Sequence, residues 1–170
     1  IPSNIKTIGD YAFYGSGLVS MDIPDTVTSI GDGAFGACAS LTSLSIGSGV
    51  TEIPADMCYG DVSLASVTLP GTITAIGTSA FSSCTKLTAI TLPSGLKTIG
   101  AYAFSGSGFV SMEVPDTVTS IGYKAIGGGI PVTVRATTPP SITSDTFDGT
   151  PSHIYVPASA VDAYKADDGW

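Results

Sequence analysis

Basic residues are scarce in this chain, which has six Lys and Arg against fourteen Asp and Glu and a net charge of −8. An acidic chain with scattered lysines lacks the electropositive surface of nucleic-acid-binding proteins, so we expect no nucleic-acid partner. No basic amphipathic segment of the membrane-surface type is present either. Uninterrupted apolar runs are only a few residues long, so we expect no membrane insertion by this segment.

Side chains for catalysis and metal binding are also few. The single histidine, His153, has no GxSxG or papain-like sequence around a nucleophile to accompany it, so we expect no enzyme and no catalytic residue. No DxDxDG calcium loop occurs, and we expect neither a metal nor a cofactor. The three cysteines show no CxxC spacing and are expected to be small buried hydrophobic residues: Cys38, Cys58 and Cys84.

Small residues are abundant instead, with 21 Gly in 170 residues, and the chain repeats itself. Residues 1–22 read IPSNIKTIGDYAFYGSGLVSMD and residues 92–113 read LPSGLKTIGAYAFSGSGFVSME. Repetition at this length predicts a solenoid, in which each coil completes the core of its neighbours. Aliphatic residues begin the units at intervals of 20 to 23 residues: Ile1, Ile23, Ile46, Leu69, Leu92, Val114 and Val134.

Three positions of each unit have a defined expected role. The position twelve residues after each start is expected to form an apolar spine along the stack: Phe13, Phe35, Cys58, Phe81, Phe104 and Ile126, with Phe147 one step later. The residue before it is usually Ala, which is small enough for close contact with a neighbouring coil. A glycine recurs eight residues after the start, where we expect positive φ or tight packing: Gly9, Gly31, Gly77, Gly100 and Gly122.

Alternation of polar and apolar residues predicts one strand per coil. The predicted strands are Ser20–Ile23, Ser43–Ile46, Ser66–Leu69, Ala89–Leu92 and Ser111–Val114. The VTSI segments fit either a very short strand or a tight turn, and the Ala-Phe segments fit a short helix or helical turn. Stacked coils of this kind predict a parallel sheet on one face of the solenoid.

The two ends of the chain differ from the repeats. Residues 156–170 are expected to form a C-terminal cap with Ser159 as helix N-cap, and residues 1–155 to form a single solenoid domain. The first unit begins in mid-pattern at Ile1, which is not Met. We therefore expect the solenoid to be truncated at its N-terminus, with any export signal outside this segment.

The units follow the pattern AFxxC…LTxIxLPxxVTxIG over nearly all of residues 1–155 and resemble BspA-type leucine-rich repeats. The resemblance implies a leucine-rich-repeat solenoid with a parallel β-sheet on one face, short helical turns, about seven coils and a C-terminal cap. It also implies an extracellular or cell-surface location in bacteria and adhesion to host proteins or other cells. The third, sixth and seventh coils depart from the pattern, and Asn4 is the only asparagine, so no asparagine ladder is expected.

The resulting hypothesis is a non-enzymatic extracellular recognition or adhesion module that contacts a protein or cell-surface partner, from a host or a neighbouring cell. Two alternatives remain: a carbohydrate-binding module of a surface glycan-capture protein, using exposed tyrosines, and a purely structural spacer. The candidate partner-binding strand face consists of Ser20, Asp22, Ser43, Ser45, Ser66, Thr68, Thr91, Ser111, Glu113, Thr133 and Tyr155.

Overall fold

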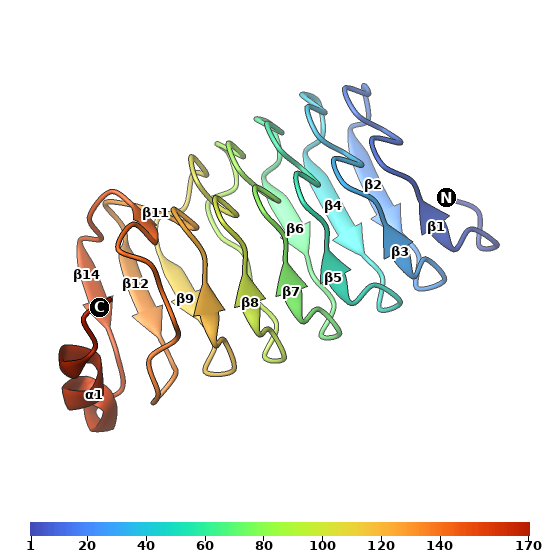
Figure 1. Ribbon diagram of the computed structural model, residues 1–170. Coiled ribbons are helices and arrows are strands. Elements are labelled where there is room, and N and C mark those ends of the chain that lie inside the picture. Colours follow the sequence, from blue (N-terminus) through green and yellow to red (C-terminus); the bar gives the residue numbers. More distant parts are fainter.

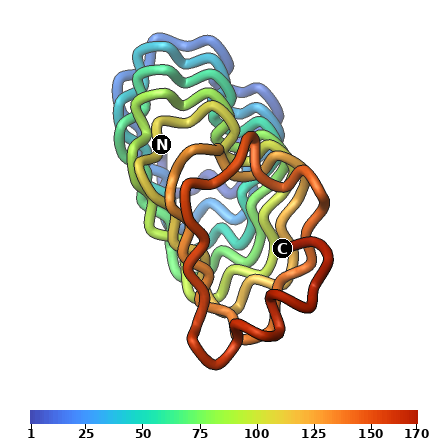
Figure 2. Tube along the Cα trace, turned by 90° about the vertical axis from the view of Figure 1, so that its left-hand side faces the viewer, coloured from blue at the N-terminus to red at the C-terminus, as the bar shows by residue number.

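The computed structural model describes all residues 1–170 and shows an elongated stack of coils, with the two chain termini at opposite ends (Figure 1). Viewed nearly along its length from the C-terminal end, in Figure 2, the stack shows successive coils following one another with nearly the same outline. The predicted solenoid of about seven turns is therefore confirmed. Its core is one continuous cluster of 38 buried residues that runs through the coils.

The longer strands of successive coils lie side by side and parallel, in two sheets of three strands each (Figure 1). The predicted register is confirmed, since Ser20 pairs with Ser43 and Ser43 pairs with Ser66. The strands are β2 (Ser20–Ile23), β4 (Ser43–Ile46) and β6 (Ser66–Thr68) in one sheet, and β9 (Met112–Val114), β12 (Pro131–Val134) and β14 (His153–Tyr155) in the other.

The predicted strand Ala89–Leu92 is wrong. These residues lie between β6 and β9 but belong to no strand, and their main-chain groups form no hydrogen bond within the protein. Alternation in the sequence predicts which side chains face inward, whereas ladder bonding also requires the neighbouring main chains to come within reach. The sheet face is consequently interrupted at the end of the fourth coil.

The VTSI segments form a second line of short strands in each coil. They are β1 (Thr7–Ile8), β3 (Ser29–Ile30), β5 (Glu52–Ile53), β7 (Ala75–Ile76), β8 (Thr98–Ile99) and β10 (Ser120–Ile121). Strands β1 and β3 pair with each other, and β5, β7, β8 and β10 form a four-stranded sheet. Further along, β11 (Ile126–Gly127) pairs with β13 (Phe147–Asp148). Of the two alternatives predicted for the VTSI segments, the structure therefore shows the short strand.

The Ala-Phe segments form overlapping tight turns. The amide of Ser82 donates to the carbonyl of Ser79 at 3.0 Å, a turn of the expected helical kind. The turns do not continue into a helix, because Ser79 and Ser83 have positive φ (54° and 61°). Intervening amides point to the next coil instead, as when Phe81 N–H donates to the Ala103 carbonyl at 2.8 Å. These bonds tie each coil to its neighbour on this side of the stack.

The predicted apolar spine is present. Phe35, Phe81 and Phe104 are fully buried, and the rings of Phe81 and Phe104 stack with centroids 5.8 Å apart and planes 5° from parallel. The recurring glycines have no positive φ, and tight packing against the preceding coil explains all of them except Gly9 in the first coil, where a Cβ would meet nothing. A Cβ on Gly100 would lie 2.7 Å from the main chain of Gly77 in the preceding coil.

The C-terminal segment ends in a 3₁₀ turn, Ala158–Ala160, followed by helix α1 (Val161–Ala166) at one end of the stack (Figure 1). The expectation that Ser159 is the N-cap is wrong, because Ala160 holds that position and no side chain caps the helix. Two side-chain bonds attach the segment to the solenoid. The Tyr164 hydroxyl donates to the Ala136 carbonyl at 3.0 Å, and Trp170 Nε1 donates to the Pro140 carbonyl at 2.9 Å.

Candidate functional site

The candidate strand face lies on the solvent side of the two sheets. None of its residues is buried, and Ser43, Ser45 and Thr133 are half-buried while the others are exposed. Within each sheet the register brings its members into rows, for example Asp22, Ser45 and Thr68. Thr91 belongs to the fourth coil, where the sheet is interrupted, so the structure does not place it in a row with its neighbours by strand pairing.

The hydroxyl groups of this face are not used for bonds between coils. Away from the face, several threonine hydroxyls bond to the preceding coil, as Thr42 does to the Val19 carbonyl at 2.9 Å and Thr72 does to the Val50 carbonyl at 2.6 Å. Others, such as that of Thr26, have no partner. The hydroxyls of the strand face form no hydrogen bond within the protein: Ser20, Ser43, Ser45, Ser66, Thr68, Thr91, Ser111 and Thr133. They are therefore free to bond to water or to a partner.

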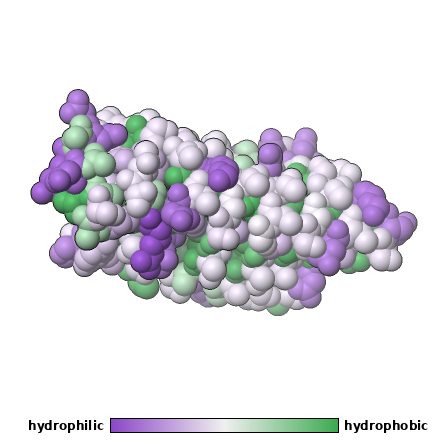
Figure 3. Space-filling model, turned by 90° about the horizontal axis from the view of Figure 1, so that it is seen from below, coloured by the Kyte–Doolittle hydropathy of each residue, from purple (hydrophilic) through white to green (hydrophobic).

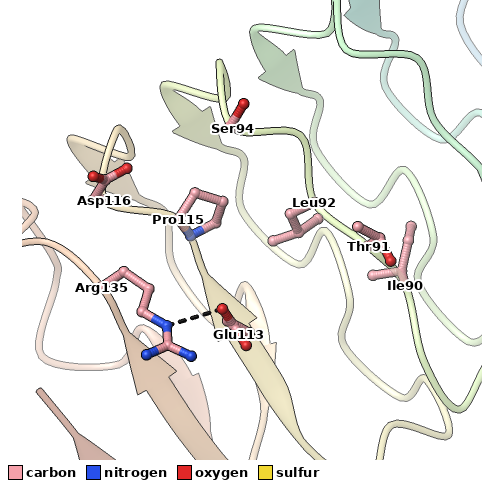
Figure 4. Close-up of a pocket in the computed structure, with 8 residues that line it drawn as sticks. All are labelled: Ile90, Thr91, Leu92, Ser94, Glu113, Pro115, Asp116 and Arg135. Atoms are coloured by element: carbon pink, nitrogen blue, oxygen red, sulfur yellow. Dashed lines mark hydrogen bonds and ion pairs between the residues drawn. The ribbon is translucent and has the colours of Figure 1, made fainter.

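A pocket of about 660 Å³ opens where the sheet is interrupted. Figure 4 shows residues 90–92 on one side of it and β9 with Glu113 on the other. Its lining includes Ile90 and Leu92, whose positions in the repeat face the core, and also Pro115. The remaining lining residues are polar: Thr91, Ser94, Glu113, Asp116 and Arg135. The pocket thus combines an apolar part with charged and hydroxyl groups, as ligand pockets commonly do.

One ion pair organises the charges of this pocket. Arg135 Nε donates to Glu113 Oε1 at 2.9 Å across neighbouring strands (Figure 4). This hydrogen bond and the charge of Arg135 hold the pKa of the Glu113 carboxyl below its usual value. Both side chains remain more than half exposed, so the pair adds little to stability but leaves the other guanidinium nitrogens and Glu113 Oε2 accessible.

Asp116 faces the same pocket without a partner of its own. Its local sequence, VPDTVTSIG, repeats the IPDTVTSIG around Asp25. Asp25 Oδ1 accepts a hydrogen bond from the amide of Ser48 in the next coil at 2.6 Å. Asp116 forms no side-chain hydrogen bond or ion pair and is exposed. Two carboxylates and one guanidinium therefore border the pocket.

Sequence reasoning identified Thr91 and Glu113 but missed the other polar residues of the pocket. A signal was present for Arg135, the only arginine of the chain. In most units the residue directly after the start is Pro, and Arg135 takes that position in the seventh unit. No signal distinguished Asp116 from Asp25, because their flanking sequences are nearly identical. Their difference arises from the coil that follows each of them.

A second residue that sequence reasoning missed, Asp61, is fully buried. It takes, in the third coil, the position of Cys38 and Cys84 in the second and fourth coils. Its Oδ1 accepts the Cys38 amide at 2.7 Å, while Oδ2 is buried without a hydrogen-bond partner. Burial raises the pKa of Asp61 to about 7, although the bond from Cys38 opposes this change.

The three cysteines are free and buried, as predicted. Burial raises the pKa of the Cys84 thiol to about 12, which makes it a poor nucleophile at neutral pH. The Cys38 and Cys84 thiols donate to the carbonyls of Phe13 and Cys58. No three His, Cys, Asp or Glu side chains come together as a possible metal site. His153 is exposed on β14, stacked against Tyr155.

The exposed tyrosines lie mainly on the turn side of the coils. Tyr11 and Tyr14 form one edge-to-face pair, and Tyr102 and Tyr123 form another with ring centroids 5.3 Å apart. Lys124 lies 5.7 Å from the centre of the Tyr123 ring. From the side shown in Figure 3, strongly hydrophilic residues form separate patches on a surface of mostly intermediate hydropathy.

No helix has the length and apolar character needed to cross a bilayer. No curated protein sequence matches this chain closely enough to count as a relative. Among solved structures, a leucine-rich repeat protein from Bacteroides ovatus is similar with a TM-score of 0.79 and 22% identity, over 94% of this chain and 48% of that one. This chain thus spans about half the length of the B. ovatus protein.

Two further solved structures have the same fold. The leucine-rich repeat protein TpLRR of T. pallidum matches with a TM-score of 0.70 and 24% identity, over 97% of this chain and 80% of that one. One from Eubacterium ventriosum matches with a TM-score of 0.52 and 32% identity, over 64% of this chain and 36% of that one. The family model described as "BspA type Leucine rich repeat region (6 copies)" matches residues 6–129. The repeated units, their stacked fold and this match together show that the chain belongs to the BspA-type leucine-rich repeat family.

Proposed function

We propose that this protein is a non-enzymatic recognition module that binds a protein partner through its strand face, outside the cell or at its surface. Repeat proteins of this architecture commonly present one extended face to their partners. The observation that carries the proposal is the row of free hydroxyls on that face, whereas several threonines elsewhere, such as Thr42 and Thr72, bond to the preceding coil. Free hydroxyls on a regular scaffold offer hydrogen bonds to a partner at little conformational cost.

Membership of the BspA-type family supports the proposed location. BspA-type repeats are associated with the bacterial cell surface, and a surface location would place the strand face where proteins of a host or a neighbouring cell are accessible. The proposed partner is accordingly a surface or extracellular protein of another cell.

Two matched variants test the strand face. Ser43→Lys with Thr68→Lys changes two hydroxyl positions of the face, whereas Ser40→Lys with Val62→Lys adds the same charge at exposed positions outside it. Binding to an array of purified extracellular proteins and to intact host cells is measured for wild type and both variants. We expect the first variant to lose at least tenfold in affinity and the second to bind as wild type does. Equal binding by both variants would exclude this face.

Carbohydrate binding is the second candidate, supported by the Tyr102–Tyr123 pair. Exposed aromatic rings beside polar groups suit sugar binding, and Lys124 and Asp148 form an ion pair at 3.3 Å next to this pair. A glycan array with the Tyr102→Ala variant separates the two candidates. Glycan binding that this variant abolishes would favour the carbohydrate-binding function over the strand face.

A further inference from the structure

We propose that the pocket at the sheet interruption binds a lysine or arginine side chain from an extended segment of the partner protein. This inference rests on the proposed function and specifies where on the strand face the partner is anchored. The pocket is bordered by residues 90–92, β9 and Arg135 (Figure 4). Three properties of the pocket support a basic side chain on an extended segment: the apolar part of its lining, its charge and the unpaired main chain of residues 89–92.

The apolar part suits the carbon chain of a basic residue. Ile90, Leu92 and Pro115 line the pocket, although Leu92 is only 8% exposed and its repeat position faces the core. The interruption of the sheet makes them reachable from the strand face. Lysine and arginine cover apolar surface with their methylene groups while the charged end stays in contact with water or an anion.

The charge of the pocket favours a cation. Asp116 carries an unpaired carboxylate, and Glu113 keeps Oε2 free while Oε1 binds Arg135. Against these two carboxylates stands only one guanidinium, and the whole chain carries a net charge of −8. The protein therefore attracts basic partner segments at long range and repels acidic ones.

The unpaired main chain of residues 89–92 is the reason for proposing an extended partner segment. The N–H and C=O groups of residues 89–92 form no hydrogen bond in the protein, whereas equivalent groups in β4 bond to both neighbours. A volume of about 660 Å³ exceeds that of one side chain and admits the main chain that flanks it. Polar groups of that main chain satisfy the free groups of residues 89–92, as in other strand-binding sites.

The lining also argues against a sugar in this pocket, because it contains no aromatic ring for a sugar to stack on. An acidic ligand would have Arg135 as its one favourable contact and would face Asp116 and Glu113 at the same time. These two alternatives become outcomes of the experiment.

NMR titration of the ¹⁵N-labelled protein with blocked tripeptides tests the inference. The probe is acetyl-Thr-Lys-Thr-amide, and the matched controls replace Lys by norleucine, which keeps the carbon chain, or by Glu, which reverses the charge. We expect the Lys peptide to bind with a dissociation constant on the order of 1 mM and to shift amide signals of residues 89–94 and 113–116. The norleucine and Glu peptides should leave these signals in place.

Two variants complete the test. Asp116→Asn should weaken binding of the Lys peptide roughly three- to tenfold, whereas Asp25→Asn, at the equivalent position of the second coil, should leave it unchanged. The proposal is overturned if the Lys peptide causes no localised shifts, if the norleucine or Glu peptide causes the same shifts, or if Asp116→Asn binds normally. A failed titration with an intact effect of Ser43→Lys and Thr68→Lys would remove the pocket but retain the strand face.

Discussion

Asp61 occupies a position at which the neighbouring coils place a cysteine that donates a hydrogen bond to a main-chain carbonyl. An ionised carboxylate can only accept hydrogen bonds, and here Oδ1 accepts one from the Cys38 amide while Oδ2 has no partner. Protonation removes the cost of a buried charge and supplies a donor. The titratable groups around this carboxyl are the buried thiols of Cys38, Cys58 and Cys84.

The first prediction concerns pH and this residue. The folded-state pKa of Asp61, about 7, lies well above the ordinary aspartate value of 3.8. The stability from its protonation is therefore fully present below about pH 4 and is lost as pH rises through about 7. At pH 8, Asp61→Asn, which cannot ionise, should therefore unfold at a higher denaturant concentration than wild type. Its free energy of unfolding should be larger by on the order of 2 kcal/mol. Urea unfolding at several pH values measures this.

The control for this prediction is Asp168→Asn, which removes an exposed carboxylate near the C-terminus. Its stability should follow the pH profile of wild type. If the free energies of unfolding of Asp61→Asn and wild type change in parallel between pH 4 and pH 8, the buried carboxyl does not titrate in that interval.

At the scale of the element, the Ala-Phe turns and the C-terminal helix show how main-chain bonding shapes a coil. In the turns, alternate amides bond to the next coil, so no amide series is left to extend a helix. The final coils are held to helix α1 by Tyr164 and Trp170, whose rings meet edge to face with centroids 5.0 Å apart. We propose that residues 156–170 act as the C-terminal cap, covering the apolar end of the last coils.

The second prediction tests this cap. Tyr164→Phe removes the hydroxyl that donates to the Ala136 carbonyl and leaves that carbonyl without its partner. We expect the last coils to lose about 1–3 kcal/mol of stability. The measurement is amide hydrogen exchange, which should become faster in β12 and β14. Tyr14→Phe is the control, because Tyr14 is exposed and its hydroxyl bonds to no protein group. Similar exchange rates in both variants would show that the segment does not stabilise the last coils.

At the scale of the whole molecule, each coil contacts mainly the coils before and after it. Pairing follows this order, for example from β2 to β4 and from β4 to β6. Stability in such stacks approximates a sum of coil terms and nearest-neighbour terms. The aromatic spine is a direct probe of this coupling, because Phe81 and Phe104 stack whereas Cys58 separates Phe35 from Phe81.

The third prediction is a pair of double-mutant cycles with Phe→Leu substitutions. Phe81→Leu combined with Phe104→Leu should show a coupling energy of about 0.5–1.5 kcal/mol, because the two rings touch. Phe35→Leu combined with Phe104→Leu should be additive within about 0.5 kcal/mol. Urea unfolding of the single and double variants supplies the energies. Equal coupling in both cycles would contradict nearest-neighbour stabilisation.

The sequence by itself determined the period of the repeat, the aromatic spine, the inward and outward sides of most strands and the family. This was possible because each repeat position contacts the same position in the next coil, so the same physical requirement recurs along the chain. Phe81 and Phe104 met that requirement in the sequence and stack in the structure. The strand face was visible in the sequence for the same reason, although its role in binding stays a prediction.

Only the tertiary structure decided where this regularity stops. Residues 89–92 alternate as β4 does, yet their main chain lies outside the ladder. Asp25 and Asp116 share nearly the same flanking residues, yet only Asp25 meets an amide of the next coil. Ladder bonds and carboxylate partners depend on the distance between neighbouring coils, and local residue patterns do not encode that distance.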